Sequence, residues 1–354
     1  MRKAAISLLC LASSVFVAGA ANGQSLDDLK ADHKTTGDVL TYGMGYNNQR
    51  YSPLKSINAG NVSKLVPIWN YSLNNPQGQE SQPIIYQGVM YVTTHTSTVA
   101  IDAMTGKQIW KHELEFKPEV FKMACCGLVN RGGALYNGKF YRTTLDSHVL
   151  ALDAKTGKQL WKSSAIDWKL GHAMTGAPIV ANGVVMTGIA GGEYGTRGFI
   201  DGWDPETGKQ LWRTYTTAVG KEKGADTWPG DTAMKGGAST WLTGAYDPDL
   251  DLVYWGTGNG GPWNPEVRKG DNWYVCSVVA FKPKTGEIAW HYQFSPNDPY
   301  DYDSTDPGML VDMKVGGKMV PGRIDIQFDY DRGVATWLTL DDKGNVVESK
   351  EYPP

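Results

Sequence analysis

Residues 100–110 read AIDAMTGKQIW, and the pattern returns three more times along the chain. The tryptophans that close the copies are 51, 51 and 78 residues apart. Repeats of about 40 to 50 residues that are built from short strands are typical of β-propeller blades. The further copies are ALDAKTGKQLW at 151–161, GWDPETGKQLW at 202–212 and the looser AFKPKTGEIAW at 280–290, and VPIW at 66–69 resembles the end of an earlier copy.

Each copy has a simple physical interpretation as part of a blade. An alternating strand such as residues 149–153 reaches a turn at Thr156-Gly157, where glycine supplies a positive φ. A second strand follows and ends in tryptophan, which we expect to dock between neighbouring blades. Asn-Gly pairs at 137–138 and 182–183 predict further hairpin turns, and no segment of the sequence has a long helical period. The sequence therefore predicts an all-β fold, a β-propeller.

The longest spacing between tryptophans contains a segment rich in glycine, proline and tryptophan, at residues 219–272. We expect it to be an insertion in the repeat. Long ordered loops in compact domains are often functional. The alternative is a tolerated surface insertion.

Composition narrows the class of protein. The 354 residues carry a net charge of −3 and only 20% charged side chains, but 42 glycines and 13 tryptophans. Many glycines and aromatic residues fit tight turns between short strands, and argue against helical bundles and disorder. The small net charge favours neither nucleic acid nor an anionic membrane surface as a partner. The sequence has no Walker A loop, no dinucleotide-binding glycine signature and no zinc-type histidine spacing.

The N-terminus has the pattern of a secretory signal. Arg2 and Lys3 precede an apolar run at residues 4–18, and small residues follow at 18–23. A membrane anchor is the alternative, but the run is short for a span and no basic stop sequence follows. We expect 1–23 to be a signal peptide, and the mature chain to be periplasmic without a membrane span.

Two adjacent cysteines are the most unusual local feature. The Cα atoms of Cys125 and Cys126 are about 3.8 Å apart across a trans peptide, which is shorter than most disulfides allow. Two free thiols are the alternative to a strained ring, and export to an oxidising compartment favours the ring. Cys276 would then be left over.

Two glycine-rich segments offer oxygen ligands. Glu193 lies in GGEYG at 191–195, and Asn259 lies in GTGNG at 256–260. Carboxylate and amide oxygens suit a hard cation such as Ca²⁺, although each residue alone is also common in turns. An acidic segment at 297–306 fits either a metal site or a solvated loop, because close carboxylates repel unless they are solvated, protonated or bound to metal. Its aspartates are Asp298, Asp301, Asp303 and Asp306.

Two arginines could hold an anionic ligand. Arg131 follows the cysteine pair, and Arg332 lies in a later strand. A planar polycarboxylate needs forked cationic donors. An ordinary ion pair at the surface is the alternative for each.

All these segments occur together, and in this order, in the PQQ-dependent alcohol and methanol dehydrogenases (PQQ, pyrroloquinoline quinone). The chain resembles this family from Thr41 to its C-terminus. The matching motifs are QESQP at 79–83, CCGLVNR at 125–131, MTGAP at 174–178, GGEYG at 191–195, TW at 240–241, GTGN at 256–259, PWN at 262–264 and PYDYD at 299–303.

The resemblance implies a role for each matching residue. PQQ would lie between Trp241 and a bridged Cys125–Cys126 ring. Glu193, Asn259 and Asp301 would bind a metal ion, and Asp301 would also be the catalytic base. Further contacts to PQQ would come from Glu80, Arg131, Thr175, Ser239, the backbone of Gly191 and Gly192, and Arg332.

The resemblance also implies a reaction. A small primary alcohol would be oxidised to an aldehyde, and electrons would pass to a periplasmic cytochrome c. An acidic residue at Asp303 resembles the lanthanide-dependent type, since three negative charges suit a trivalent ion, with Ca²⁺ as the alternative. The identity of the alcohol and the oligomeric state stay open, and a homodimer is one alternative.

The chain also departs from the family. Family members are longer and have eight blades, whereas residues 24–354 would supply only five or six, a partial propeller. Two other classes share features of the sequence. A non-catalytic periplasmic propeller scaffold would have the repeats, and a calcium-stabilised sugar-binding or hydrolytic propeller would have the metal ligands. Neither explains the cysteine pair.

Overall fold

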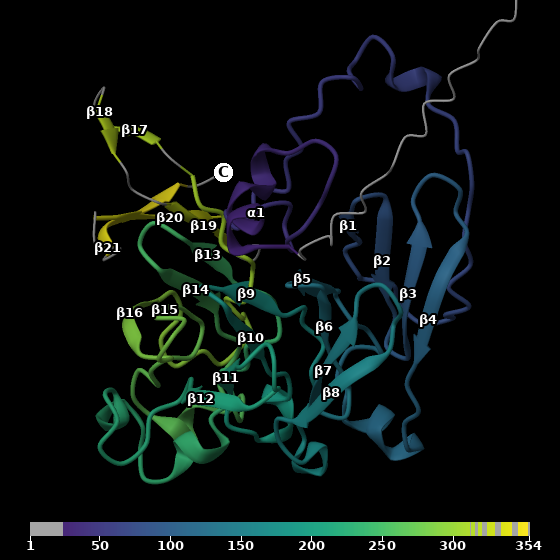
Figure 1. Ribbon diagram of the computed structural model, residues 1–354. Coiled ribbons are helices and arrows are strands. Elements are labelled where there is room, and N and C mark those ends of the chain that lie inside the picture. The colour runs from purple at the N-terminus through teal and green to yellow at the C-terminus, as the bar shows by residue number, and fades with distance from the viewer. Residues whose placement is uncertain are drawn as a thin grey trace, which may run out of the picture.

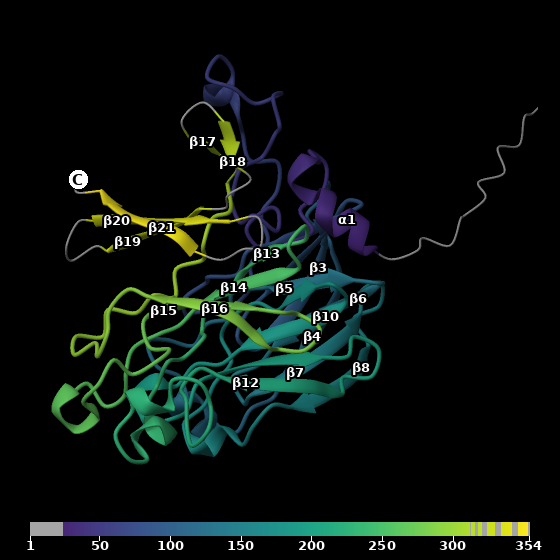
Figure 2. The ribbon, with the colours of Figure 1, turned by 90° about the vertical axis from the view of Figure 1, so that its left-hand side faces the viewer.

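The computed structural model describes residues 24–311 and the segments 313–315, 318–320, 324–329, 334–341 and 346–352. The expected signal peptide, 1–23, and Arg332 lie outside the described residues. Four sheets follow one another around part of a ring (Figure 1), and a view turned by 90° shows their strands running in similar directions (Figure 2). In the part of the chain that the structure describes, no helix is long and apolar enough to cross a membrane.

Each of these four sheets has four antiparallel strands that are consecutive in the chain. The first blade comprises β1 (Ile84–Tyr86), β2 (Val89–Thr93), β3 (Ser97–Asp102) and β4 (Gln108–Glu113). The second comprises β5 (Gly133–Tyr136), β6 (Lys139–Thr143), β7 (His148–Asp153) and β8 (Gln159–Ser164). The third comprises β9 (Ile179–Ala181), β10 (Val184–Gly188), β11 (Phe199–Trp203) and β12 (Gln210–Tyr215). The fourth comprises β13 (Ala245–Asp247), β14 (Leu252–Gly256), β15 (Ser277–Phe281) and β16 (Ile288–Gln293).

The remaining elements are short or lie near the C-terminus. A hairpin is formed by β17 (Met313–Val315) and β18 (Lys318–Val320), and a three-stranded sheet by β19 (Ile324–Asp329), β20 (Val334–Leu340) and β21 (Val346–Tyr352). The α-helix α1 (Leu26–Ala31) starts with a capping box between Ser25 and Asp28. The 3₁₀ helices are η1 (Asp32–Lys34), η2 (Val62–Lys64), η3 (Pro118–Met123), η4 (Trp168–Leu170), η5 (Gly192–Tyr194), η6 (Ala225–Thr227), η7 (Thr232–Lys235) and η8 (Pro265–Arg268).

Most of the repeated tryptophans join one blade to the next, as the sequence predicted, whereas the buried Nε1 of Trp290 has no hydrogen-bond partner among the described residues. The indole Nε1 of Trp110 in β4 donates to the carbonyl of Ala154 in the second blade, at 3.0 Å. The same bond recurs from Trp69 to Ala103 (3.0 Å), from Trp161 to Pro205 (3.2 Å) and from Trp212 to Pro283 (2.9 Å).

The Thr-Gly turn of the repeat completes this docking. Gly157 has a φ of 71°, and a Cβ atom there would lie 2.5 Å from the ring of Trp110. Glycine is therefore needed both for the backbone conformation and for the close approach of the indole. One expectation was wrong: the second strand does not end at tryptophan, because β8 continues three residues beyond Trp161 to Ser164.

A second correction concerns residues 219–272, which are not one insertion. The segment contains β13 and β14, the first half of the fourth blade. The sequence hides this hairpin because its turn lacks an Asn-Gly pair. The carboxylate of Asp247 instead accepts the backbone N–H groups of Asp249 and Leu250, at 2.9 and 3.0 Å. Two long loops are left, 216–244 before β13 and 257–276 between β14 and β15.

Candidate active site

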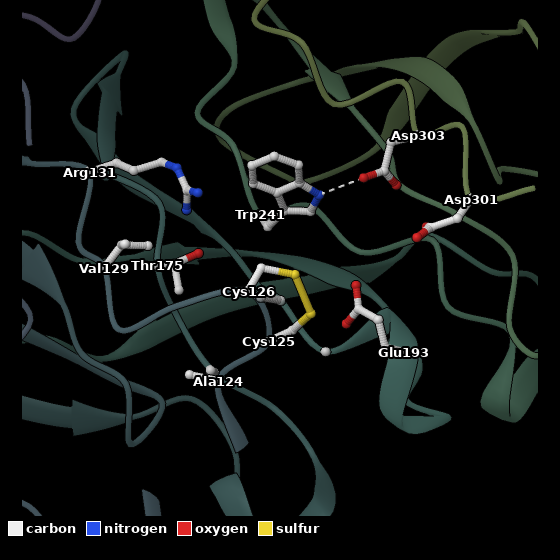
Figure 3. A pocket seen from close by; sticks show the side chains of 13 residues that line it. Ala124, Cys125, Cys126, Val129, Arg131, Thr175, Glu193, Trp241, Asp301 and Asp303 are labelled. Carbon is white, nitrogen blue, oxygen red and sulfur yellow. Dashed lines mark hydrogen bonds between the residues drawn. A yellow bond between two sulfur atoms is a disulfide. The ribbon is translucent and has the colours of Figure 1, made fainter. Parts of the chain in front are cut away.

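The candidate site lies where these loops meet. In an antiparallel blade, the connection from the second strand to the third and the connection to the next blade leave from the same end of the sheet. At this end a cavity of about 150 Å³ opens to solvent. Its lining residues are Ala124, Cys125, Cys126, Val129, Arg131, Ala173, Thr175, Ala190, Gly191, Glu193, Trp241, Asp301 and Asp303 (Figure 3).

The adjacent cysteines form one rim of this pocket. Cys125 and Cys126 are joined in a disulfide, which follows η3 directly. The predicted ring is therefore formed, and Cys276 is a buried free cysteine, as expected. Cys126 has a φ of 65°, a left-handed conformation that non-glycine residues seldom adopt. Figure 3 shows the two sulfur atoms at the pocket, which Trp241 also lines.

Trp241 is held in place from two sides. Its Nε1 donates to Oδ2 of Asp303 at 3.1 Å, and Oδ1 of Asp303 accepts the backbone N–H of Asn259 at 2.6 Å. The guanidinium carbon of Arg131 lies 4.7 Å from the centre of the indole ring. The expected stacking residue is thereby tied to the expected metal ligands.

Arg131 forms an ion pair, which was the alternative for this residue, and it also lines the pocket, while its contact with an anionic ligand stays a prediction. Its Nη2 lies 2.7 Å from Oε2 of Glu80, and its side chain is mostly buried. The backbone N–H of Arg131 donates to the carbonyl of Thr175 at 2.9 Å. A forked cation is thus fixed beside the indole, where an anionic ligand would meet it.

The oxygens expected to bind metal belong to residues that line the pocket or lie directly behind its wall. Among the described residues, the buried atoms Oδ1 of Asn259 and Oγ of Ser239 have no hydrogen-bond partner. Buried polar atoms without a partner are uncommon and call for a ligand or another explanation. Glycines allow the close approach: a Cβ atom on Gly192 would lie 2.9 Å from Oδ1 of Asn259, and one on Gly258 would lie 2.6 Å from Oδ1 of Asp303. Unpartnered amide and hydroxyl oxygens beside carboxylates fit a hard cation.

The three acidic side chains of the site share one pocket but are not close enough together to form a metal-binding cluster. Glu193, Asp301 and Asp303 line the same pocket, but the described residues contain no group of three His, Cys, Asp or Glu side chains with metal-binding geometry. Loss of water, followed by the charges of Glu193 and Asp298, raises the pKa of Asp301 to about 6. Burial, followed by the charge of Asp301, raises the pKa of Asp303 to about 7. A cation among these groups would relieve the repulsion.

The structure thus brings most of the predicted residues together. Glu80, Gly192, Ser239 and Asn259 do not line the pocket but contact residues that do or lie directly behind its wall. The cofactor and metal roles of these residues stay predictions.

Three residues were missed in the sequence analysis as parts of the site. Trp263, within the PWN motif, hydrogen-bonds through its side chain to Asp301. Asp298, which was grouped with the other aspartates, is fully buried and accepts the N–H of Tyr300 at 3.0 Å. Arg268 is fully buried beneath the acidic segment, and a single arginine gives no signal in a sequence.

Comparisons with known proteins agree with this geometry. Residues 40–326 match the family described as "PQQ: Glucose/ethanol/alcohol dehydrogenase, beta-propeller domain". The chain is 42% identical to quinohemoprotein alcohol dehydrogenase ADH IIB of Pseudomonas putida over 89% of its length and 48% of that protein. It is 38% identical to quinoprotein alcohol dehydrogenase PedH of the same species, over 89% of this chain and 56% of that one.

A solved structure shows the same similarity. A europium-containing methanol dehydrogenase superposes with a TM-score of 0.85 at 36% identity, covering 92% of this chain and 60% of that one. The chain spans about half the length of the curated relatives it matches.

Proposed function

This chain belongs to the glucose/ethanol/alcohol dehydrogenase β-propeller family, and from that premise we propose that it oxidises a small primary alcohol to an aldehyde with PQQ and a bound metal ion. One observation carries the proposal. A disulfide between adjacent cysteines and an indole face the same pocket, and the indole is hydrogen-bonded to an aspartate beside the unpartnered oxygen of Asn259.

The residues around the pocket suit a flat, anionic cofactor. The Cys125–Cys126 ring and the Trp241 indole offer polarizable surfaces that a planar quinone would lie between. Arg131 would meet a carboxylate of PQQ, and Glu80 keeps the guanidinium oriented through their 2.7 Å ion pair. Thr175, Ser239, the backbone of Gly191 and Gly192, and Arg332 complete the proposed set of contacts. A non-catalytic scaffold would have no use for these features.

The metal would be held by Glu193, Asn259, Asp301 and Asp303. Three carboxylates and one amide oxygen make a strongly negative site of hard ligands. We propose a lanthanide(III) ion, because three charges on the cation balance three carboxylates. Ca²⁺ is the alternative, since it accepts the same ligands with less charge neutralisation.

The protein's own part in the reaction is to position the alcohol and to take its proton. When bound, PQQ would supply an electrophilic carbonyl that accepts hydride, and the metal would act as a Lewis acid. Asp301 lines the pocket, where its carboxylate would accept the proton of the alcohol oxygen. The raised pKa of about 6 belongs to the site without a cation; a metal ion beside Asp301 would lower this pKa, so that the carboxylate would be ionised at neutral pH and able to accept a proton. The hydrogen bond from Trp263 would keep this carboxylate oriented.

The remaining parts of the proposal concern location and partners. Residues 1–23 have the composition of a cleaved signal peptide, which supports export to the periplasm. Electrons would then pass to a periplasmic cytochrome c. A homodimer is compatible with the proposal but is not required by it.

Reconstitution tests the proposal. The protein is incubated with PQQ and La³⁺ or Ca²⁺, and dye-linked oxidation of primary alcohols is measured. We expect turnover only when both cofactors are present, and we expect Asp301→Asn to abolish it while PQQ stays bound. Full turnover by Asp301→Asn, or no turnover under any combination of metal and PQQ, would contradict the proposal.

A further inference from the structure

Arg268 is a fully buried cation that ends η8, in the long loop before β15. Within this loop its Nε donates to the carbonyl of Pro262 at 2.8 Å, and its Nη1 donates to Oδ1 of Asn272 at 2.7 Å. The side chain of Asn272 in turn donates to the carbonyl of Arg268 at 2.7 Å. These bonds within its own loop fix the orientation of the guanidinium.

The same guanidinium contacts two of the three loops that carry the proposed metal ligands. On one side it packs on Gly260, the residue after Asn259, where a Cβ atom would lie 2.5 Å from the guanidinium carbon. On the other side Nη1 donates to Oδ1 of Asn297 at 3.0 Å, and Nη2 donates to the carbonyl of Asp298. Asn297 and Asp298 begin the segment that presents Asp301 and Asp303. Arg268 thus joins the loop of Asn259 to the loop of Asp301 and Asp303, whereas Glu193 lies on a third loop, in η5.

The acidic loop has a conformation that needs such support. Asn297, Asp301 and Asp303 have φ values of 50°, 65° and 54°, all in the left-handed region. Non-glycine residues persist there only when their surroundings hold them. Inside the loop, the buried carboxylate of Asp298 accepts the N–H groups of Tyr300 and Tyr302, at 3.0 and 3.3 Å. Arg268 anchors the start of this arrangement to the rest of the site.

We propose that Arg268 is a positioning residue, which sets the distance between Asn259 and the Asp301–Asp303 segment and so determines the affinity of the site for its cation. This inference rests on the proposed function, because it assigns Arg268 to the same metal site. Residues behind metal ligands typically change metal affinity by about 10- to 100-fold when they are replaced. Lysine would keep the charge of Arg268 but lose the planar fork that reaches both loops.

The chain offers a matched control. Arg142 is also fully buried, and it also donates to backbone carbonyls, those of Ser97 at 2.7 Å and Thr94 at 2.9 Å. These bonds link the first two blades rather than the two ligand loops. Arg142→Lys therefore makes the same chemical change in a comparable environment, without touching the proposed metal site.

The test measures cation binding directly. Eu³⁺ is titrated into the full chain to which PQQ has been added, and the luminescence lifetimes in H₂O and D₂O report the number of water molecules on the ion. We expect Arg268→Lys to weaken Eu³⁺ binding about 10-fold or more and to add water to the ion. Asn297→Gly should act in the same direction with a smaller effect, because it removes one acceptor of Arg268 at a position where glycine tolerates the positive φ. Arg142→Lys should leave affinity and lifetime unchanged.

The outcomes separate this inference from the proposed function. If the wild type binds no Eu³⁺, or if Glu193→Gln binds as well as the wild type, the proposed metal site is wrong and the inference falls with it. If Glu193→Gln weakens binding but Arg268→Lys and Asn297→Gly do not, only the role of Arg268 is refuted. Equal losses in Arg268→Lys and Arg142→Lys would also refute it, since a general loss of stability would then explain both. If Arg268→Lys fails to fold, Asn297→Gly decides the question.

Discussion

A single methyl group placed on Gly192 should displace the amide ligand of the metal site. A Cβ atom at this position would lie 2.9 Å from Oδ1 of Asn259 and 3.3 Å from Oγ of Ser239. The first distance is shorter than carbon and oxygen tolerate, so in Gly192→Ala one of the two partners must move. Overpacking in a tight interior costs about 1–3 kcal/mol. If movement of Asn259 relieves that strain, cation affinity falls by about 5- to 150-fold, since every 1.4 kcal/mol is a factor of about ten.

Isothermal titration of La³⁺ into protein to which PQQ has been added would measure the effect. Gly37→Ala is the matched control, because a Cβ atom there meets nothing within 4 Å. We expect Gly37→Ala to bind La³⁺ like the wild type, and both variants to unfold cooperatively. The alternative result is a La³⁺ affinity of Gly192→Ala within a factor of about two of the wild type, a difference of about 0.4 kcal/mol. It would contradict the proposal that the close packing of Asn259 against Gly192 places the amide oxygen at the cation.

Three further predictions concern stability, pH and metal preference. Trp161→Ala removes a docking indole and its bond to Pro205, and urea unfolding should show that the free energy of unfolding falls by about 3–5 kcal/mol. Leu160→Ala, at the exposed neighbouring position, should lower it less. Equal losses in the two variants would contradict the docking role. Burial lowers the pKa of His291 from 6.5 to about 4. Between these two pH values the unfolded chain binds a proton on this histidine that the folded chain does not bind. The free energy of unfolding should therefore fall by up to about 3 kcal/mol as the pH drops from 6.5 to about 4. Urea titrations of His291→Phe should show a smaller fall than the wild type, and an identical pH dependence would argue against this assignment. Asp303→Ser removes one negative charge from the site, so the ratio of La³⁺ to Ca²⁺ affinity should decrease about tenfold or more, and an unchanged ratio would count against the lanthanide proposal.

The blade architecture was predictable because its determinants are local and repeated. The Thr-Gly turn and the tryptophan of each copy act on each other across neighbouring blades, as the contact of Gly157 with Trp110 illustrates. The fourth blade was obscured since its first hairpin turns through Asp247, whose side chain replaces the Asn-Gly signal. A sequence search for alternating strands and Asn-Gly turns does not detect a turn that is formed by an aspartate side chain.

The site was predictable only as far as motifs reach. The disulfide of Cys125 and Cys126 and the placement of Trp241 and Glu193 at one pocket agree with the expectation. The hydrogen bond between Trp241 and Asp303 joins residues 62 positions apart, and nothing in the sequence indicates it. Arg268 could not be found for the same reason, because its role depends on two loops that only the folded chain brings together.

The amount of PQQ that the protein binds tests the proposed cofactor site most directly. Absorbance of the bound quinone, measured after unbound PQQ is removed, gives the stoichiometry with and without added La³⁺ or Ca²⁺. We expect one PQQ per chain, retained only when a cation is present and lost on Trp241→Ala. Absence of PQQ from the protein under every metal condition, or equal retention by Trp241→Ala, would contradict the proposed site.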